Sequence, residues 1–291
     1  MAAVFEFKVE IVLSAVPAIE QLLGEREEQH LMVVEDKPAA RAWLTGYYEL
    51  RESAQKGWKG FASALDAEWL VTEPVIAELA DKDWKESYKE HFKAWRFGRL
   101  HWVPVWERDL FQLPESDEVL WLDPGMAFGT GNHETTRLVV ERLVTLAEKK
   151  GTSGGVIDAG CGSGILALSA VKLGFTTVAA FDNDELAVKI SLQNAELNGL
   201  GGKVDFYVGD LVSGLAGRRA EILLANIQAD VLMKFASELL GAVAPGGTLV
   251  MSGILAAELD RVREVFADKA PAWSTSSITM GEWSDLVLIR S

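Results

Sequence analysis

The second two thirds of the chain alternates short apolar runs with segments in which apolar positions have helical spacing. The apolar runs predict strands at 156–159, 178–181, 204–208, 221–225 and 248–252. The helical spacing predicts helices at 137–146, 165–174, 187–197, 230–243 and 255–266, and residues 277–280 and 285–290 predict a terminal antiparallel pair. Alternating strands and helices indicate an α/β domain with a largely parallel sheet covered on both faces.

The first eighty residues have a different pattern, in which predicted elements follow in the order βαββαβ. Strands are predicted at 5–11, 30–34, 42–50 and 68–72, with helices at 15–23 and 52–65. This order is typical of a ferredoxin-like sandwich, so we predict a small α+β domain at 1–80. From 81 to 99, basic and aromatic residues recur at steps of three and four, which predicts a linker helix at 81–100. The second domain then covers 101–291, with its first strands at 100–105 and 118–122.

A glycine-rich turn joins the strand at 156–159 to the next helix. Gly160, Gly162 and Gly164 allow a sharp turn and close approach of a ligand, and the helix start offers free N–H groups to an anion. Asp182 ends the following strand about twenty residues on, where a carboxylate can bind ribose hydroxyls. The pattern predicts a nucleoside-containing cofactor, either a nicotinamide dinucleotide or S-adenosylmethionine. Because the spacing is GxGxG rather than GxGxxG, it favours S-adenosylmethionine.

Polar residues also follow the other predicted parallel strands. Asp210 and Asn226 come at strand ends, as Gly160 and Asp182 do, and the carboxyl ends of parallel strands form the usual ligand site. The polar loop 123–136 precedes a helix. We expect its Gly129 and Gly131 to permit a tight wrap around a ligand, and its Thr135 and Thr136 to cap the helix. By itself, His133 in this loop is more typical of a structural hydrogen-bonding residue than of a catalyst.

Composition narrows the class of protein. Residues are 49% hydrophobic and 24% charged, and the net charge of −15 argues against nucleic acid as the main partner and favours a cationic one. A single cysteine excludes an internal disulfide framework, and with four scattered histidines we expect no metal site. No apolar run approaches the ~20 residues of a membrane span, and residues 1–13 lack a signal-peptide pattern. We therefore expect a cytoplasmic protein.

Several motifs resemble those of the bacterial ribosomal protein L-11 methyltransferases, a class I S-adenosylmethionine-dependent family. They are Asp123-Pro124-Gly125, Ala127-Phe128-Gly129-Thr130-Gly131 with His133 and Thr135-Thr136, Asp158 with Gly160-Cys161-Gly162-Ser163-Gly164, Ala225-Asn226-Ile227, and Asp83-Trp84 with Arg96-Phe97-Gly98. The resemblance covers 81 to 291, and the GTGxHxTT stretch is its most specific part. It implies a C-terminal Rossmann-like class I methyltransferase domain, a helical linker, and an N-terminal domain that recognises L-11.

The resemblance also implies roles for single residues. Family members trimethylate an α-amino group and lysine ε-amino groups, and cofactor contacts carried onto this sequence fall on Thr136, Gly160, Asp182 and Asn226. We expect Gly162, Gly164 and Asp210 to contribute to the same cofactor site. The Asn226 side chain would orient the amine, and the loop with Gly129, Thr130 and His133 would close over the reacting groups. We expect a monomer that modifies L-11 and does not bind nucleic acid or membranes.

Three other interpretations stay open at this point. The chain could be a class I N-methyltransferase that acts on another protein or on a small amine. It could be a nicotinamide-dependent dehydrogenase, although the sequence offers no clear catalytic lysine or tyrosine constellation. It could also be a non-catalytic binding module, against which the intact glycine loop, Asp182 and Asn226 argue. Cofactor binding and methylation of L-11 discriminate among them.

Overall fold

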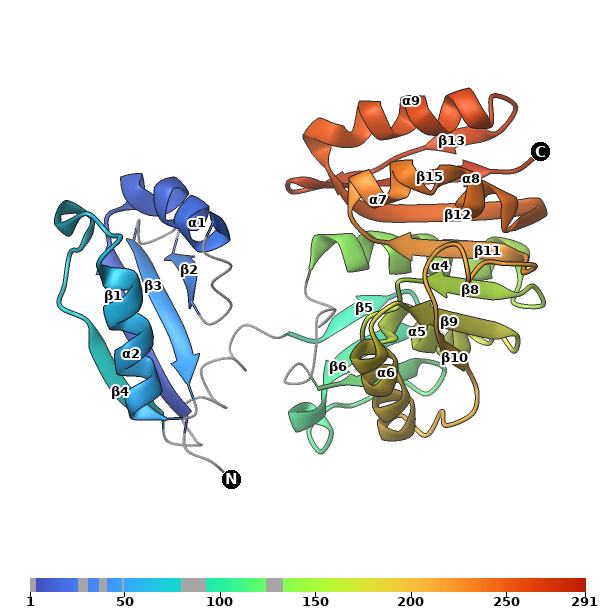
Figure 1. Cartoon of the computed structure of the whole chain (residues 1–291). Helices are drawn as coiled ribbons and strands as arrows, with labels where there is room; N and C mark the ends of the chain where they lie inside the picture. The colour runs from blue at the N-terminus through green and yellow to red at the C-terminus, as the bar shows by residue number, and fades with distance from the viewer. Residues whose placement is uncertain (1–3, 26–30, 37–40, 49, 80–92, 124–132) are drawn as a thin grey trace. The chain divides into compact units, whose positions relative to one another are not determined.

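The computed structural model describes residues 4–25, 31–36, 41–48, 50–79, 93–123 and 133–291. The chain divides into two compact units, Met1–His91 and Phe92–Ser291 (Figure 1). Each unit has its own buried hydrophobic residues. The division falls within the predicted linker 81–100, of which residues 81–92 lie outside the described residues.

The first unit has the predicted ferredoxin-like arrangement. Its elements are β1 (Val4–Ile11), α1 (Val16–Glu25), β2 (Leu31–Asp36), β3 (Arg41–Tyr48), α2 (Arg51–Ala62) and β4 (Val75–Leu79). The strands form an antiparallel sheet in the order β2-β3-β1-β4. Alternation along β1 turns Phe7, Val9 and Ile11 into the core, where Ile19 of α1 and Phe61 of α2 are also buried.

The strand predicted at 68–72 is wrong. Residues Ala67–Trp69 form a short 3-10 helix, and the fourth strand is β4, which pairs with β1. Asp66 explains the difference, because its side chain accepts a hydrogen bond from the backbone N–H of Glu68 at 3.2 Å and caps the turn. A capped turn competes with strand formation over the same residues.

The second unit contains the predicted α/β sheet. Its elements are β5 (Trp95–Phe97), β6 (Leu100–Pro104), β7 (Glu118–Leu122), α4 (Glu134–Lys150), β8 (Val156–Ala159), α5 (Ile165–Leu173), β9 (Val178–Asp182), α6 (Glu185–Leu197), β10 (Asp205–Val208), β11 (Ala220–Asn226), α7 (Ala229–Lys234), α8 (Ala236–Gly241), β12 (Val243–Leu255), α9 (Leu259–Lys269), β13 (Ser274–Ser276), β14 (Thr279–Met280) and β15 (Trp283–Ile289). Strands β10-β9-β8-β11-β12 are parallel, and β15 joins β12 antiparallel. The strand order reverses between β8 and β11, the usual position of a ligand site. The helix predicted at 230–243 is divided into α7 and α8 at Phe235.

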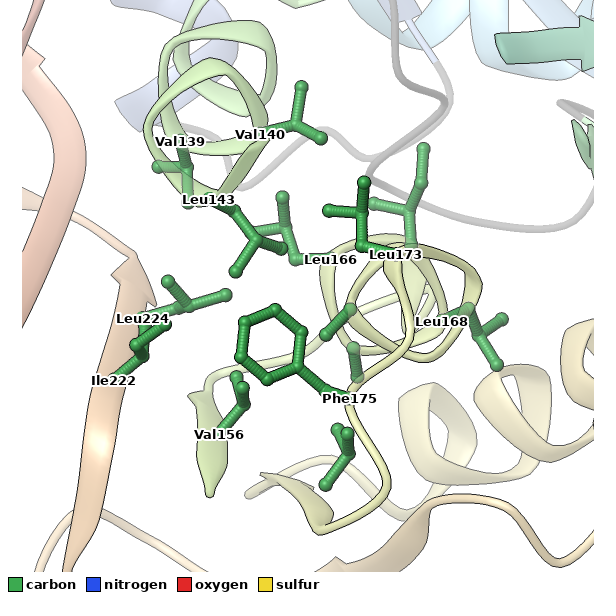
Figure 2. Packing of buried hydrophobic residues seen from close by; sticks show 14 of the residues in the cluster. Val139, Val140, Leu143, Val156, Leu166, Leu168, Leu173, Phe175, Ile222 and Leu224 are labelled. Atoms are coloured by element: carbon green, nitrogen blue, oxygen red, sulfur yellow. The ribbon is translucent and has the colours of Figure 1, made fainter. Parts of the chain in front are cut away.

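Helices cover both faces of this sheet, as the sequence predicts. Side chains of α4 and α5 pack with those of β8 and β11 on one face, including Val140, Leu143 and Leu166 around Phe175 and Leu224 (Figure 2). Side chains of α7, α8 and α9 pack on the other face. Burial on both faces explains why these strands appear in the sequence as continuous apolar runs.

A small separate sheet, β5-β6-β7, begins the second unit and corrects the linker prediction. Trp95 and Phe97 belong to β5, which pairs antiparallel with β6, so the helix predicted at 81–100 does not extend to 100. Gly98 has φ of +57° and permits the tight turn between the two strands. Within the described residues, no helix is long and apolar enough to cross a membrane.

Candidate active site at the carboxyl ends of the parallel strands

The glycine loop, residues 160–164, connects β8 to α5 as predicted. Gly160, Gly162 and Gly164 have φ angles of +75°, +52° and +77°, a region that other residues adopt only with strain. A Cβ atom on Gly160 would lie 2.6 Å from Cγ2 of Ile227, just beyond β11. The first glycine is therefore required both by the turn and by the close approach of the neighbouring strand end.

The glycine loop is tied to the elements that follow it. Ser191 of α6 donates through Oγ to the carbonyl of Gly162 at 2.8 Å, and Nδ2 of Asn194 donates to the carbonyl of Ser163 at 2.9 Å. Two loop N–H groups donate to the carbonyl of Phe181 in β9 at 2.9 and 3.0 Å. These bonds fix the loop before any ligand arrives. No sequence pattern points to Ser191 or Asn194, because their role depends on how α6 packs.

Asp182 lies at the end of β9 and faces the glycine loop. Its Oδ2 accepts from the backbone N–H of Gly162 at 2.9 Å, and its Oδ1 accepts from that of Asp184 at 3.1 Å. The side chain is half-buried. A carboxylate oxygen can accept more than one hydrogen bond, so both oxygens retain capacity for hydroxyl donors of a ligand.

Asp158, on β8 below the loop, belongs to the same motif, although the sequence alone assigns it no role. It is 1% exposed; Oδ2 accepts from the N–H of Ala167 at 3.1 Å, and Oδ1 has no hydrogen-bond partner within the described part of the chain. Burial raises the pKa of the Asp158 carboxyl to about 7; the Ala167 bond opposes this shift, and the charge of Asp182 adds to it. A lone acid inside the apolar run 156–159 was the signal available in the sequence.

The neighbouring thiol has no catalytic features. Cys161 is buried, and burial is the main cause that raises the pKa of its thiol. The thiol therefore stays protonated near neutral pH and is a poor nucleophile. The described residues contain no group of three or more His, Cys, Asp or Glu side chains placed to hold a metal ion.

Asn226 and Thr136, the second pair of site residues, are joined directly. Asn226 ends β11, and its Nδ2 donates to Oγ1 of Thr136 in the first turn of α4 at 3.3 Å. Thr136 is 3% exposed, whereas Asn226 is half-buried. Because β11 pairs with β8, Asn226 emerges at the same sheet edge as the glycine loop. The structure thus brings together residues ninety positions apart.

The cap of α4 corrects one expectation. His133, not Thr135 or Thr136, is the N-cap residue: its backbone is extended, and Nδ1 accepts from the N–H of Thr135 at 3.4 Å. Both threonines are buried inside the first turn. Gly129 and Thr130, predicted for the closing loop, lie outside the described residues.

Asp210 follows β10 at the predicted strand end, but its hydrogen bonds stay within its own loop. Its Oδ1 accepts from the N–H groups of Val212 at 3.0 Å and Ser213 at 2.7 Å, and from the Ser213 hydroxyl at 2.7 Å. The bonds from Ser213 are the main cause that lowers the pKa of Asp210. The structure therefore shows a loop-stabilising contact for this residue.

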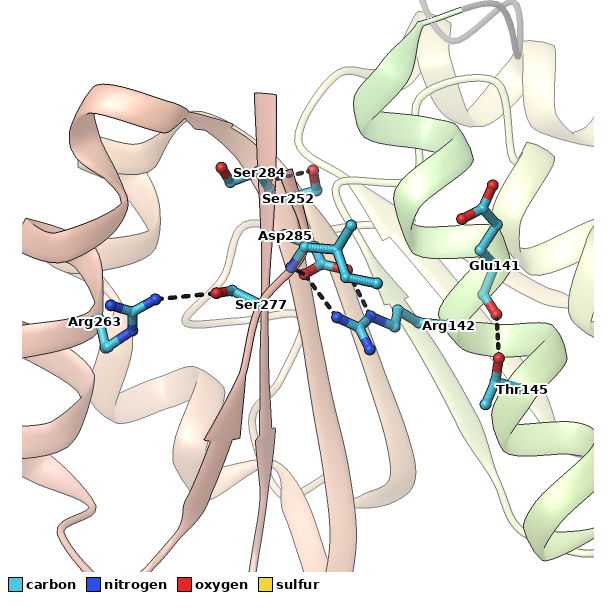
Figure 3. Close-up of polar contacts among 9 residues, drawn as sticks. Glu141, Arg142, Thr145, Ser252, Arg263, Ser277, Ser284 and Asp285 are labelled. Atoms are coloured by element: carbon cyan, nitrogen blue, oxygen red, sulfur yellow. Dashed lines mark hydrogen bonds and ion pairs between the residues drawn. The ribbon is translucent and has the colours of Figure 1, made fainter. Parts of the chain in front are cut away.

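Strand β15 holds α4 against the sheet at two points. Arg142 of α4 forms a two-pronged ion pair with the fully buried Asp285, with Nε–Oδ2 and Nη2–Oδ1 distances of 2.6 and 3.1 Å (Figure 3). Nearer the site, the His133 ring lies edge-on to the ring of Trp283, with centroids 4.9 Å apart. These contacts fix the helix that carries Thr136.

Comparison with known proteins identifies the family. The model of the family described as ribosomal protein L11 methyltransferase (PrmA) matches residues 11–291. A ribosomal protein L11 methyltransferase from Geobacter metallireducens is 40% identical over 215 residues, 74% of this chain and 68% of the relative. One from Pelotomaculum thermopropionicum is 44% identical over 178 residues, 61% of this chain and 56% of the relative, so this alignment spans little more than half of the relative's length.

A solved structure supports the same assignment. The crystal structure of ribosomal protein L11 methylase from Lactobacillus delbrueckii subsp. bulgaricus is similar to this chain with a TM-score of 0.61 at 30% sequence identity, and the match covers 69% of this chain and 100% of that one. The family match and the structural likeness agree with the class I methyltransferase arrangement of the glycine loop and strand ends. The chain belongs to the ribosomal protein L11 methyltransferase family.

Proposed function

We propose that this chain transfers methyl groups from S-adenosylmethionine to the α-amino group and the lysine ε-amino groups of ribosomal protein L11. The observation that carries the proposal is the meeting of two half-sites at one sheet edge. The donor half, which would hold the methyl donor, is the glycine loop with Asp158 and Asp182. The acceptor half, which would hold the amine that receives the methyl group, is Asn226 with Thr136. Strands β8 and β11 are direct neighbours, about 5 Å apart, so a methyl group held by one half lies within reach of an amine at the other.

The donor half fits S-adenosylmethionine on its own chemistry. The backbone of the glycine loop leaves space that a side chain would fill. The Asp182 carboxylate can accept hydrogen bonds from the two ribose hydroxyls. Oδ1 of Asp158, which has no hydrogen-bond partner among the described residues, places acceptor capacity beneath a site for a cationic cofactor. Gly162, Gly164 and Asp210 complete the donor half, and we propose that Thr136 and Asn226 of the acceptor half also contact the cofactor. Bound there, the cofactor supplies an electrophilic methyl group.

The acceptor half must present a neutral amine. A free lysine with pKa near 10.4 loses its proton at pH 7 at a cost of about 4 to 5 kcal/mol, which burial and a nearby positive charge reduce. The proton leaves to solvent before transfer. Asn226 Oδ1 then accepts an amine hydrogen and directs the nitrogen lone pair toward the methyl carbon, while Nδ2 stays on Thr136. Positioning and desolvation supply the catalysis without an obligate general base.

The first unit is proposed to recognise L11. It folds around its own core, separate from the sheet that carries the glycine loop, which supports an independent binding role. We propose that the recognition domain covers 1–80 and that the linker ends before β5, so that the methyltransferase domain includes β5 and β6 and not only 101–291. The net charge of −15 suits a lysine-bearing substrate better than nucleic acid, and we propose that the protein acts as a monomer.

A methylation assay on purified L11, read by intact-protein and peptide mass spectrometry, tests this function. We expect mass increments of whole methyl groups on the amino terminus and on lysines. Asp182→Ala should weaken cofactor binding at least about tenfold by calorimetry and reduce methylation accordingly. Asp184→Asn is the matched control, because Asp184 lies two residues away and its side chain caps α6 through the N–H of Leu186.

The alternative acceptors give distinct results in the same assay. If the wild-type protein binds S-adenosylmethionine but leaves L11 unchanged while methylating another protein or a small amine, the substrate assignment is wrong and the reaction class stands. If calorimetry shows nicotinamide dinucleotide binding instead, the reaction class is wrong as well. Failure to bind either cofactor would support a non-catalytic module.

A further inference from the structure

Backbone pairing between β8 and β11 ends before the two halves of the site begin. The last pair in their register is Asp158 with Leu224, and Gly160 and Asn226 each lie two residues beyond it. On its other side, β11 stays paired with β12 as far as Asn226 and Ser252. The acceptor half is therefore fixed by strand pairing on the side of β12 but not on the side of the glycine loop. A different contact must set the distance between the two halves.

We propose that Ile227, the residue after Asn226, is a positioning residue that sets this distance through its Cγ2 methyl group. The inference rests on the proposed function, since it concerns the approach of a methyl donor to an amine at Asn226. A Cβ atom on Gly160 would lie 2.6 Å from Cγ2 of Ile227. Apart from its chain neighbours, no other atom of the described residues would come within 4 Å of that Cβ position. The methyl group of Ile227 is thus the point at which the end of β11 meets the glycine loop.

Gly253 of β12 holds Ile227 from the opposite side. A Cβ atom on Gly253 would overlap the carbonyl oxygen of Ile227 and would lie 2.8 Å from its carbonyl carbon. Gly253 has φ of +81°, and the pairing of β12 with β15 shifts register between Met251 and Ile254. Glycine is required here because β12 lies directly against the backbone of Ile227. Ile227 therefore packs between two glycines, with its side chain on one and its backbone on the other.

Both neighbours of Ile227 are themselves fixed. Next to Gly253, the fully buried Ser252 donates through its hydroxyl to the carbonyl of Ser284, also fully buried, at 3.0 Å (Figure 3). The Ser284 hydroxyl lies 2.8 Å from that of Thr279 in β14. On the other side, the glycine loop is bonded to β9 and α6. The size and branching of the Ile227 side chain therefore determine how near Asn226 lies to the loop.

Isoleucine suits this role, and the reaction is sensitive to it. Two γ carbons on one Cβ restrict rotation about χ1, so the Cγ2 methyl group of Ile227 has a defined direction. Methyl transfer needs the reacting atoms aligned about 3 to 3.5 Å apart, and a displacement of about 1 Å can slow such a step roughly a hundredfold. A change at Ile227 should therefore reduce turnover while the contacts that bind the cofactor and the amine remain.

Steady-state kinetics on L11, with calorimetry of S-adenosylmethionine binding, tests the inference. Ile227→Leu keeps the side-chain volume but removes the Cγ2 methyl group. We expect kcat to fall about tenfold, while KM for L11 and the cofactor Kd change less than about twofold. Ile227→Val keeps this methyl group and should retain at least about half of the wild-type kcat. Ile222→Leu is the matched control, because it makes the same exchange at a buried position at the other end of β11 and should behave as the wild type.

Two kinetic results would overturn the inference. One is a wild-type kcat in Ile227→Leu, and the other is an equal loss of kcat in Ile227→Leu and Ile227→Val, which would mean that the Cγ2 methyl group has no part of its own. Urea titration of the two leucine variants checks that both are folded.

A second measurement needs neither L11 nor turnover. Ile227→Ala removes the atom that an added methyl group on Gly160 would meet, so it should restore measurable S-adenosylmethionine binding to the Gly160→Ala variant. Binding that stays absent in the double variant contradicts the proposed contact. Because this readout is independent of the substrate, it separates failure of the inference from failure of the proposed function, which methylation of L11 by the wild-type protein tests.

Discussion

The two halves of the site are built in different ways. The donor half is a short stretch of chain in which backbone N–H groups and carbonyls of 160–164 bond to β9 and α6. The acceptor half is a side-chain bond, from Asn226 to Thr136, between two elements that meet only in the folded sheet. One half is therefore set by local backbone geometry, and the other depends on the position of α4. Changes at distant residues should affect the acceptor half more.

The largest expected effect concerns the charge of Asp158 in the donor half. Its pKa is about 7 in the folded protein against about 3.9 in an unfolded chain, so between these values the folded state binds the proton that the unfolded state has lost. The contribution of Asp158 to the free energy of unfolding is fully present below pH 4 and falls as the pH rises to 7, by roughly 4 kcal/mol at most. Asp158→Asn should abolish this part of the decline, which denaturant titrations from pH 4 to 8 would measure.

The same carboxyl should make cofactor affinity depend on pH. Because its ionised form favours a cationic ligand, S-adenosylmethionine should bind more tightly as the pH rises through 7, with proton release detectable by calorimetry in buffers of different ionisation enthalpy. Among the described residues, the titratable groups coupled to this carboxyl are Asp182 and the thiol of Cys161. A pH dependence that persists unchanged in Asp158→Asn would contradict the assignment.

The sequence predicted the donor half of the site better than the acceptor half. Strand, glycine turn and helix are consecutive, so the positions of Gly160 and Asp182 followed from spacing alone. Asn226 was placed at a strand end, but its bond to Thr136 depends on how α4 packs across the sheet, and no local pattern encodes that packing. The cap of α4 was expected at Thr135 or Thr136, because histidine is an uncommon cap residue, but the structure places the His133 imidazole there.

The fold was predictable where periodicity was strong and mispredicted where turns decided the outcome. The α/β sheet and the βαββαβ order appear as expected. Continuous apolar runs determine the first, and the alternation of apolar and polar residues along the strands determines the second. The strand predicted at 68–72 was wrong because the Asp66 side chain caps a turn there. The end of the predicted linker helix was wrong because Gly98 allows a hairpin between β5 and β6.

The ion pair between Arg142 and Asp285 shows whether α4 supports the acceptor half. Asp285→Ala leaves Arg142 without its partner at a largely buried position and should lower the free energy of unfolding by about 3 kcal/mol, as measured in urea. In the remaining folded protein, kcat on L11 should fall more than cofactor affinity. Asp260→Ala breaks an exposed ion pair with Arg263 on α9. It should leave the free energy of unfolding, kcat and cofactor affinity unchanged. Equal loss in binding and turnover would mean that the halves are not separable.

The backbone of the donor half should respond to a single added methyl group. Gly160→Ala combines positive φ with a methyl group 2.6 Å from Ile227 and should reduce the free energy of unfolding by about 2 kcal/mol and abolish measurable cofactor binding. Gly202 has a similar φ of +71°, but a methyl group there would have no atom of the described residues within 4 Å. Gly202→Ala should therefore cost about 1 kcal/mol and leave binding intact. Comparable binding in the two variants would show that close packing at Gly160 is unimportant.

The smallest expected effect comes from Trp283, which contacts the cap of α4. Trp283→Leu removes the edge-on ring contact with His133 and should cost about 1 kcal/mol. Because the contact lies at the helix start, hydrogen exchange should accelerate at the amides of 134–137 while those of 160–164 keep their protection. Trp273→Leu, in the core beside α9, is the control and should not alter exchange at 134–137. If the Trp283 variant exchanged faster in both segments, the glycine loop would depend on α4, and the donor half would be less self-sufficient than its backbone bonds indicate.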